Sequence, residues 1–178
     1  MSIVESFNKT IIFFDEIKRE NIIKDYALIG GLALSAWIRP RATIDIDLAV
    51  IVSEKLKWTD IASVIETRLQ RKVALEIGTQ RTDIKKKLSF IVGQVEVDLI
   101  SAEGFKLAEE AIKNAVIAVV FGRGVKVVTP EYLILLKLLP LSTQDVVDIK
   151  ALVKRADMKN LMSLAKKHHL LPKLKSVL

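Results

Sequence analysis

The 178-residue chain contains no cysteine and only two histidines. The missing thiols exclude disulfides, thiolate nucleophiles and zinc sites with cysteine ligands. The histidines are the neighbours His168 and His169, and adjacent residues on a helix point about 100° apart. They therefore make a poor chelate and are expected at a solvated helix end. Any catalysis must depend on carboxylates, hydroxyls, lysine, arginine and a bound hard metal ion.

The chain also lacks a long hydrophobic run, since no apolar segment approaches the roughly 18 residues that a membrane-spanning helix needs. Lys137 interrupts the leucine-rich stretch between residues 133 and 139. The N-terminal residues include Glu5 and do not show the basic and apolar segments of a secretory signal. Hydrophobic residues make up 51% of the chain and charged residues 28%, which suits a soluble domain with a substantial core. We expect a cytoplasmic protein that does not contact a membrane.

Hydrophobic periodicity and turn residues predict an α/β core followed by helices. Helices are expected at residues 4–20, 32–38, 58–71 and 103–114, and strands at 26–29, 43–52, 88–92, 95–100, 116–121 and 125–128. Thr129 and Pro130 are typical of an N-cap and a first helical position, and the signals from there to Leu178 are helical. We therefore predict an α/β (α+β) core over residues 1–128, with a C-terminal helical portion over residues 129–178 packed against it.

The most informative segment is 41–48, in which polar and apolar residues alternate. On a strand, alternate side chains face opposite sides, so Asp45 and Asp47 are expected on one face with backbones roughly 7 Å apart. Two carboxylates this close repel each other unless a cation lies between them, and a hard divalent ion with oxygen ligands is the natural occupant. A half-exposed strand with solvated acids is the alternative interpretation.

The segment 95–100 repeats this alternation. Its apolar residues are expected to face the core, while Glu96 and Asp98 share the other face. If this strand pairs beside the one that carries Asp45 and Asp47, Asp98 joins them in one cluster. An edge strand with outward-facing acids would give the same pattern.

Gly30 and Gly31 follow a predicted strand and open a predicted helix. In this context backbone N–H groups can approach a phosphate, and the N-terminus of a helix favours negative charge. Two adjacent glycines are also common in simple turns. The pair therefore predicts either a phosphate-binding turn or a tight connection.

The chain contains Gly-Gly, then thirteen residues, then Asp-Ile-Asp, and later an Asp between apolar residues. This pattern resembles the signature of the DNA polymerase beta-like nucleotidyltransferase superfamily. More narrowly, the segments LIGGLAL, RATIDIDL, VEVDLI, TPEYLILLKL and DVVDIKAL are similar to the minimal bacterial and archaeal nucleotidyltransferases that include abortive-infection toxins. The resemblance covers most of residues 26–155. It implies a nucleotidyltransferase-type mixed sheet flanked by helices. It also implies an enzyme that moves a nucleoside monophosphate from a nucleoside triphosphate (NTP) to an acceptor hydroxyl.

The resemblance implies roles for individual residues. Asp45 and Asp47 would ligate two Mg²⁺ ions, with Mn²⁺ as an alternative, and one ion would accompany the triphosphate. Asp98 would hold the other ion and help to activate the acceptor hydroxyl. Gly30 and Gly31 would form the phosphate-holding turn. Phosphoryl-type transfer depends on positioning and charge neutralisation, which agrees with a site built from carboxylates and hard metal ions.

Two basic residues are candidates for contact with the nucleotide. Lys137 lies among apolar residues, so its ammonium group either snorkels to water or meets an anion. The resemblance favours contact of Lys137 with the triphosphate. Arg41 is a candidate phosphate contact or a surface ion-pair partner. Asp145 is expected to cap its helix, and Asp148 either matches an acidic position of the toxin-like members or is solvated.

The formal net charge of +7 favours encounter with polyanions, and it also serves solubility. Between positions 150 and 175 the basic residues stand against a single acid, Asp157. These basic residues are Lys150, Lys154, Arg155, Lys159, Lys166, Lys167, Lys173 and Lys175. The segment favours RNA, in particular a transfer RNA end, over a protein or a small molecule as the acceptor, although Lys-rich helices are commonly just soluble surfaces.

Two alternatives to this enzyme differ in class. In the first, the same fold serves as a non-catalytic subunit of a toxin–antitoxin pair or another complex, with an antitoxin as partner. In the second, the protein is a basic nucleic-acid-binding domain, supported by the net charge and by the run from Lys85 to Lys87. Intact Asp45, Asp47 and Asp98 favour the enzyme.

Overall fold

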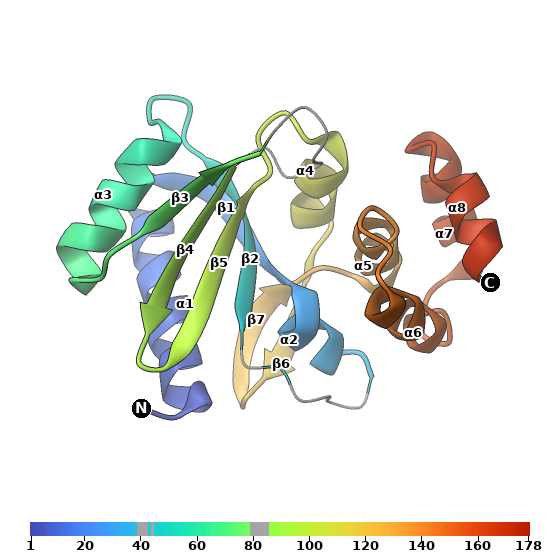
Figure 1. Ribbon diagram of the computed structural model, residues 1–178, viewed down its shortest axis with the longest axis horizontal. Helices are drawn as coiled ribbons and strands as arrows, with labels where there is room; N and C mark the ends of the chain where they lie inside the picture. The colour runs from blue at the N-terminus through green and yellow to red at the C-terminus, as the bar shows by residue number, and fades with distance from the viewer. Residues whose placement is uncertain (39–42, 44, 79–85) are drawn as a thin grey trace.

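The computed structural model describes residues 1–38, 43, 45–78 and 86–178, and in this part of the chain seven strands form one mixed sheet (Figure 1). The strands are β1 (Ile23–Ile29), β2 (Ile46–Val52), β3 (Ala74–Ile77), β4 (Lys86–Val92), β5 (Val95–Ser101), β6 (Val116–Val120) and β7 (Arg123–Val127). The helices are α1 (Ile3–Arg19), α2 (Gly30–Ser35), α3 (Trp58–Leu69), α4 (Lys106–Lys113), α5 (Pro130–Lys137), α6 (Thr143–Leu152), α7 (Met158–Lys167) and α8 (Leu171–Val177). The predicted fold class, a mixed sheet flanked by helices, is confirmed.

The strand order is β3-β4-β5-β2-β1-β7-β6, so β2 is the central strand. It pairs in parallel with β5 and antiparallel with β1. The remaining neighbours in the order are antiparallel, except for the parallel pair β1 and β7. Strands β4 and β5 form a hairpin around Gly93, which takes a positive φ of 67°.

Helix α1 covers one face of the sheet and lies behind it in Figure 1. The helix begins with a capping box, in which Ser2 accepts from the Glu5 N–H and the Glu5 carboxylate accepts from the Ser2 N–H. Its apolar residues recur at helical spacing and are almost fully buried, as the sequence predicts. They are Phe7, Ile11, Phe14 and Ile17.

The helices α5 to α8 stand together on the right of the sheet in Figure 1. Pro130 occupies the first turn of α5, as predicted, and α5 contacts both α2 and α4. Ser142 and Asp145 form the capping box of α6. The C-terminal helices therefore approach the edge of the face that α2 and α4 share. The division into units at residue 128 stays a prediction.

Several element boundaries differ from the sequence-based expectation by a few residues, and two of them concern the candidate site. Strand β2 begins at Ile46, so Asp45 precedes the strand instead of lying within it. Helix α2 includes the two glycines and ends at Ser35, before the expected residue 38. Strand β3 was not expected, because this edge strand has only four residues, and the alternation of Leu75 and Ile77 with Glu76 is too short to be distinctive.

No helix among the described residues combines the length and the apolar composition that crossing a bilayer would require.

Candidate active site

Asp47 and Asp98 occupy directly opposed positions on β2 and β5. The parallel register sets Asp47 against Asp98 and the following residues, Leu48 and Leu99, against each other. Leu48 and Leu99 are fully buried, so the two aspartates emerge on the other face of the sheet. Neighbouring strands lie about 4.8 Å apart, and the two carboxylates therefore belong to one site.

The environment of Asp47 is short of positive charge. Burial, and then the negative charges of Asp98 and Asp45, raise the pKa of Asp47 to about 6. A hydrogen bond from the backbone N–H of Gly31 and the charge of Lys87 lower the pKa but do not cancel the rise. The structure thus brings the three predicted acids into one electrostatic environment.

The Gly30–Gly31 pair lets the backbone pass directly against these acids. Gly30 has a positive φ of 65°, and a Cβ atom there would overlap the Asp47 carboxylate. A Cβ atom on Gly31 would lie 2.6 Å from Oγ1 of Thr43. Glycine is therefore required at both positions for the observed approach. The phosphate contact proposed for Gly30 and Gly31 stays a prediction, since the Gly31 N–H donates to Asp47.

Strand β4 engages both carboxylate oxygens of Asp98. The hydroxyl of Ser89 donates to Oδ1 at 2.6 Å, and Nζ of Lys87 lies 2.8 Å from Oδ2. From the sequence, Lys87 stands out only as part of the basic run from Lys85, and Ser89 does not stand out at all. A signal for them exists, because the Gly93–Gln94 turn fixes the hairpin register and sets Ser89 opposite Asp98.

The donor set suits a hard divalent ion, although one carboxylate is turned elsewhere. Within residues 1–38, 43, 45–78 and 86–178, no three His, Asp or Glu side chains are already gathered as a metal ion would require. Asp98 faces Ser89 and Lys87. The pKa of Asp47 is raised, and a bound cation would lower it. Carboxylate oxygens on adjacent strands are the kind of ligand that suits Mg²⁺.

A cavity of about 690 Å³ opens on this face of the sheet. Pockets of roughly 300–1,000 Å³ commonly hold small ligands. Its sheet side includes Gly30, Asp47 and Lys87, and its other wall comes from α4, α5 and the residues after α5. The residues from that second wall are Phe105, Ala108, Leu133, Leu136, Lys137, Leu139, Pro140 and Asp145.

Lys137 lines the same cavity and is held by two carboxylates of α6. Its Nζ lies 3.0 Å from Oδ1 of Asp145 and 2.7 Å from Oδ2 of Asp148. The Lys137 side chain is only 12% exposed, so it does not snorkel to water. Of the two alternatives for Asp148, the solvated one is wrong, because this residue is 2% exposed. Asp145 caps α6 as expected and also faces Lys137.

A family model described as "Nucleotidyl transferase AbiEii toxin, Type IV TA system" matches residues 12–171. The chain belongs to this family. As a member of the AbiEii family it is a nucleotidyltransferase, and the resemblance seen in the sequence is confirmed. No curated protein matches the chain at a significant level.

Solved structures support the fold of this AbiEii-family chain. An antigenic nucleotidyltransferase-like protein from Paracoccidioides brasiliensis is 17% identical, with a TM-score of 0.60, over 97% of this chain and 92% of that one. The antibiotic-resistance factor ANT(2'')-Ia is 18% identical in its solution structure, with a TM-score of 0.59, over 93% and 90% of the two chains. Its crystal structure with adenylyl-2"-tobramycin is 16% identical, with a TM-score of 0.56, over 97% of each chain. At these identities the likeness concerns the fold.

Three other residues considered in the sequence have different outcomes. Arg41 lies outside the described residues of this AbiEii-family chain. The expectation of a solvated histidine pair was wrong for His168, whose side chain is 8% exposed and lies 3.0 Å from Oε2 of Glu110. His169 is exposed, with a positive φ of 59° at the end of α7. Neither histidine lines the cavity beside Asp47.

Proposed function

We propose that this chain transfers a nucleoside monophosphate from an NTP to an acceptor hydroxyl, with Asp45, Asp47 and Asp98 holding divalent metal ions. The observation that carries the proposal is the opposed pair Asp47 and Asp98, of which Asp47 lines a cavity of nucleotide-compatible size. Burial and the acidic neighbours raise the pKa of Asp47. Membership of a nucleotidyltransferase family supports it. We expect Mg²⁺ as the ion, with Mn²⁺ as an alternative.

The proposed reaction is a single displacement at the α-phosphorus. The acceptor oxygen forms a bond to the α-phosphorus while the bond to the leaving pyrophosphate breaks. The hydroxyl proton passes to a carboxylate oxygen of Asp98 and then to solvent. A divalent ion bound by the three aspartates would supply charge neutralisation at the attacking and leaving oxygens.

The remaining residues of the cavity would position the triphosphate. Gly30 and Gly31 bring backbone against the site without a Cβ atom, which suits close approach of a phosphate. An ammonium group has three donors, and two of those on Lys137 face Asp145 and Asp148. In the proposed complex, the third donor of Lys137 would contact a phosphate oxygen. Charge-assisted contacts of this kind place a triphosphate without covalent help.

The acceptor is the least constrained part of the proposal. The basic residues between positions 150 and 175 are all exposed, which supports an RNA acceptor such as a transfer RNA end. A protein or a small molecule would need no such surface. The alternative that the chain is a basic nucleic-acid-binding domain loses support, because Lys86 and Lys87 pair with Glu103 and Asp98.

Labelled nucleotides test the reaction class and identify the acceptor together. The protein is incubated with Mg²⁺, a cell extract and each NTP, labelled at either the α- or the γ-phosphate. Nucleotidyl transfer predicts a macromolecule or metabolite that carries the α-label and never the γ-label. Transfer of the γ-label instead would show a kinase, and the proposal would be rejected.

We further propose that the transfer makes the chain the toxin of a toxin–antitoxin pair, in line with the description of its family. Induced expression should arrest the growth of a bacterial host, and an Asp47→Asn variant should not. Equal arrest by both proteins would separate toxicity from the aspartate site. Rescue of growth by a neighbouring gene product would identify the antitoxin.

A further inference from the structure

We propose that Lys87 exchanges partners during the reaction cycle, leaving Asp98 when a divalent ion binds and then contacting the triphosphate. The inference rests on the proposed function, because it gives Asp98 a second partner at the same site. It assigns to a residue of β4 both control over metal binding and a contact with the nucleotide.

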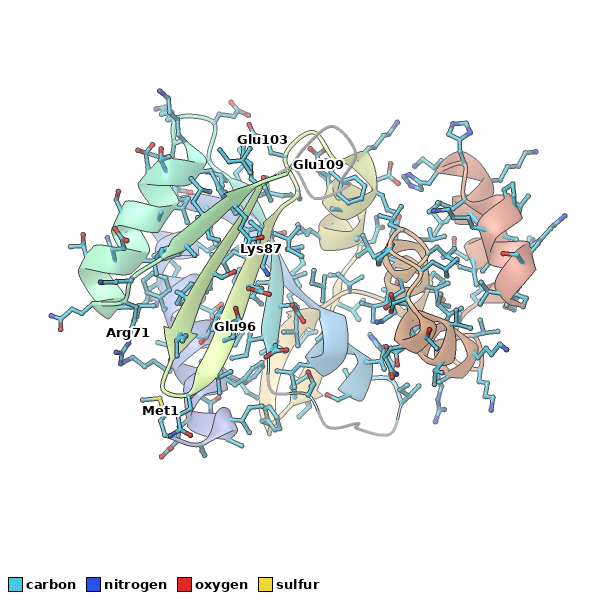
Figure 2. All side chains as sticks on the ribbon, viewed as in Figure 1. Met1, Arg71, Lys87, Glu96, Glu103 and Glu109 are labelled. Carbon is cyan, nitrogen blue, oxygen red and sulfur yellow. The ribbon has the colours of Figure 1, made fainter. Side chains whose placement is uncertain are left out.

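The starting arrangement is fully defined by described contacts. Lys87 Nζ lies 2.8 Å from Asp98 Oδ2, and Ser89 Oγ lies 2.6 Å from Asp98 Oδ1. Figure 2 labels Lys87, from β4, near the middle of the view, and Glu96, from β5, below it. Both oxygens of Asp98 are therefore occupied by groups from β4. A metal ion that needs Asp98 must displace the ammonium group, the hydroxyl or both.

Electrostatics decides which of the two leaves. A divalent ion beside Asp98 would repel the ammonium group of Lys87, since two cations would then compete for one carboxylate. The hydroxyl of Ser89 carries no net charge and can keep its hydrogen bond to Oδ1. Lysine has a flexible four-carbon stem, so its ammonium group can move without a change in β4.

The cavity is the place to which the ammonium group would move. The side chain of Lys87 is 25% exposed, and it lines the cavity together with Gly30 and Asp47. Lys137, in contrast, is 12% exposed and is fixed by two carboxylates that are not proposed metal ligands. Of these two cavity lysines, Lys87 is therefore the one that metal binding would release.

A competing destination for Lys87 lies on β3. Glu76 is the cross-strand partner of Lys87 and also lines the cavity. If the ammonium group simply moved to Glu76, nucleotide binding would not depend on Lys87. If the ammonium group instead contacts the nucleotide, removing its charge has two opposite effects: metal binding becomes tighter and nucleotide binding weaker.

The first measurement follows the melting temperature against Mg²⁺ concentration in the absence of nucleotide. Lys87→Met keeps the length of the side chain and removes its charge. The half-saturating Mg²⁺ concentration should fall by about tenfold, the size expected when one competing charge-assisted hydrogen bond is removed. The matched control is Lys86→Met, whose lysine pairs with Glu103 on the other face and should leave the titration unchanged.

The second measurement follows binding of a non-reacting α,β-methylene NTP by equilibrium dialysis at saturating Mg²⁺. Lys87→Met should weaken this binding by about tenfold, and Lys86→Met should not alter it. Lys87→Gln, which keeps a neutral donor, provides a second variant if the methionine variant fails to fold. It should show the same two shifts in the same directions.

The outcomes separate this inference from the proposed function. Tighter Mg²⁺ binding together with weaker nucleotide binding supports the exchange. Unchanged or weaker Mg²⁺ binding in the Lys87 variants overturns it, and so does unchanged nucleotide binding, which would place the released lysine on Glu76. A wild-type protein that shows no response to Mg²⁺, with or without nucleotide, contradicts the proposed metal site itself.

Discussion

At the scale of single residues, the acidic site is an unfavourable arrangement in the absence of a cation. Asp47 is largely buried beside Asp98, with Asp45 close by, and its pKa is raised to about 6 from 3.8. A carboxyl group with a raised folded-state pKa destabilises the fold wherever it must be ionised. Binding sites commonly carry such local costs, because the ligand relieves them.

Asp47→Asn should therefore stabilise the metal-free protein at neutral pH. Below pH 4 Asp47 is protonated in both the folded and unfolded states, so the variant should gain nothing. Between pH 4 and 6 the folded state holds the proton more tightly, and wild-type stability falls as the pH rises. Above pH 6 the variant should gain up to about 3 kcal/mol in the free energy of unfolding. Urea unfolding at pH 4 and pH 8 measures this difference, and an equal effect at both values would refute the assignment.

Gly30→Ala should damage the site more than its backbone strain alone explains. The new Cβ atom would overlap the Asp47 carboxylate, and Gly30 also has a positive φ of 65°. Gly122→Ala is the matched control, because Gly122 has a φ of 77° and no atom within 4 Å of a Cβ position. Each variant should lose roughly 1–2 kcal/mol of stability from strain. Only Gly30→Ala should lose more stability than this, and only Gly30→Ala should also lose thermal stabilisation by Mg²⁺ and NTP. If the two variants behave equally, the close approach of Gly30 to Asp47 has no functional consequence.

At the scale of helices and strands, short-range sequence patterns predicted most of the elements. Alternation located β4 and β5, and helical spacing located α1 and α3, because one face of each is buried. The missed strand β3 has four residues at the sheet edge, and the alternation of Leu75 and Ile77 with Glu76 is too short to stand out from the sequence. Asp45 and Asp47 were expected on one strand, yet β2 starts after Asp45.

The sequence predicted the contacts between helices and strands less well. The register of the β4–β5 hairpin follows from its turn, so Ser89 and Lys87 were within reach of the same reasoning that located Asp98. The ion pairs of Lys137 with Asp145 and Asp148 depend on how α5 packs against α6. Helical periodicity gives the faces of two helices and does not give their mutual rotation.

Lys137→Met should lower the free energy of unfolding more than substitution of a surface lysine would, because it disrupts the contact between α5 and α6. It leaves two carboxylates without their shared cation, and one of them, Asp148, is 3% exposed in its side chain. Removing one partner of a buried ion pair typically costs about 3–5 kcal/mol. The double variant Lys137→Met, Asp148→Asn should be less destabilised than the single one in urea unfolding. A loss below about 1 kcal/mol in the single variant would contradict the structural role.

At the scale of the whole molecule, the sheet supplies the acids and the C-terminal helices close the cavity beside them. Helix α5 contributes Lys137 to the cavity, and the basic residues of α6, α7 and α8 lie on the exposed side of the same helical group. A polyanion bound to those helices would approach the molecule on the side where α5 lies (Figure 1).

Binding of transfer RNA should accordingly be carried by phosphate contacts. Gel-shift titration of total transfer RNA at two salt concentrations measures this, because each neutralised phosphate steepens the fall of affinity with salt. We expect micromolar binding that survives near-physiological salt. The triple variant Lys150→Gln, Lys154→Gln, Lys159→Gln should reduce the salt slope by about 2–3. No binding even at low salt would leave protein and small-molecule acceptors.

The central claim, a metal-dependent transferase site on Asp47 and Asp98, is tested most directly by comparing four reactions. Transfer of α-labelled NTP to an acceptor is measured for the wild type with Mg²⁺, the wild type with EDTA, Asp47→Asn and Glu96→Gln. Glu96 is an exposed acid two positions before Asp98 on the same strand, so it controls for the loss of one negative charge. The account predicts transfer by the wild type and Glu96→Gln, and a loss of at least about 100-fold in Asp47→Asn and with EDTA. Transfer by Asp47→Asn at the wild-type rate, or transfer that persists in EDTA, would contradict it.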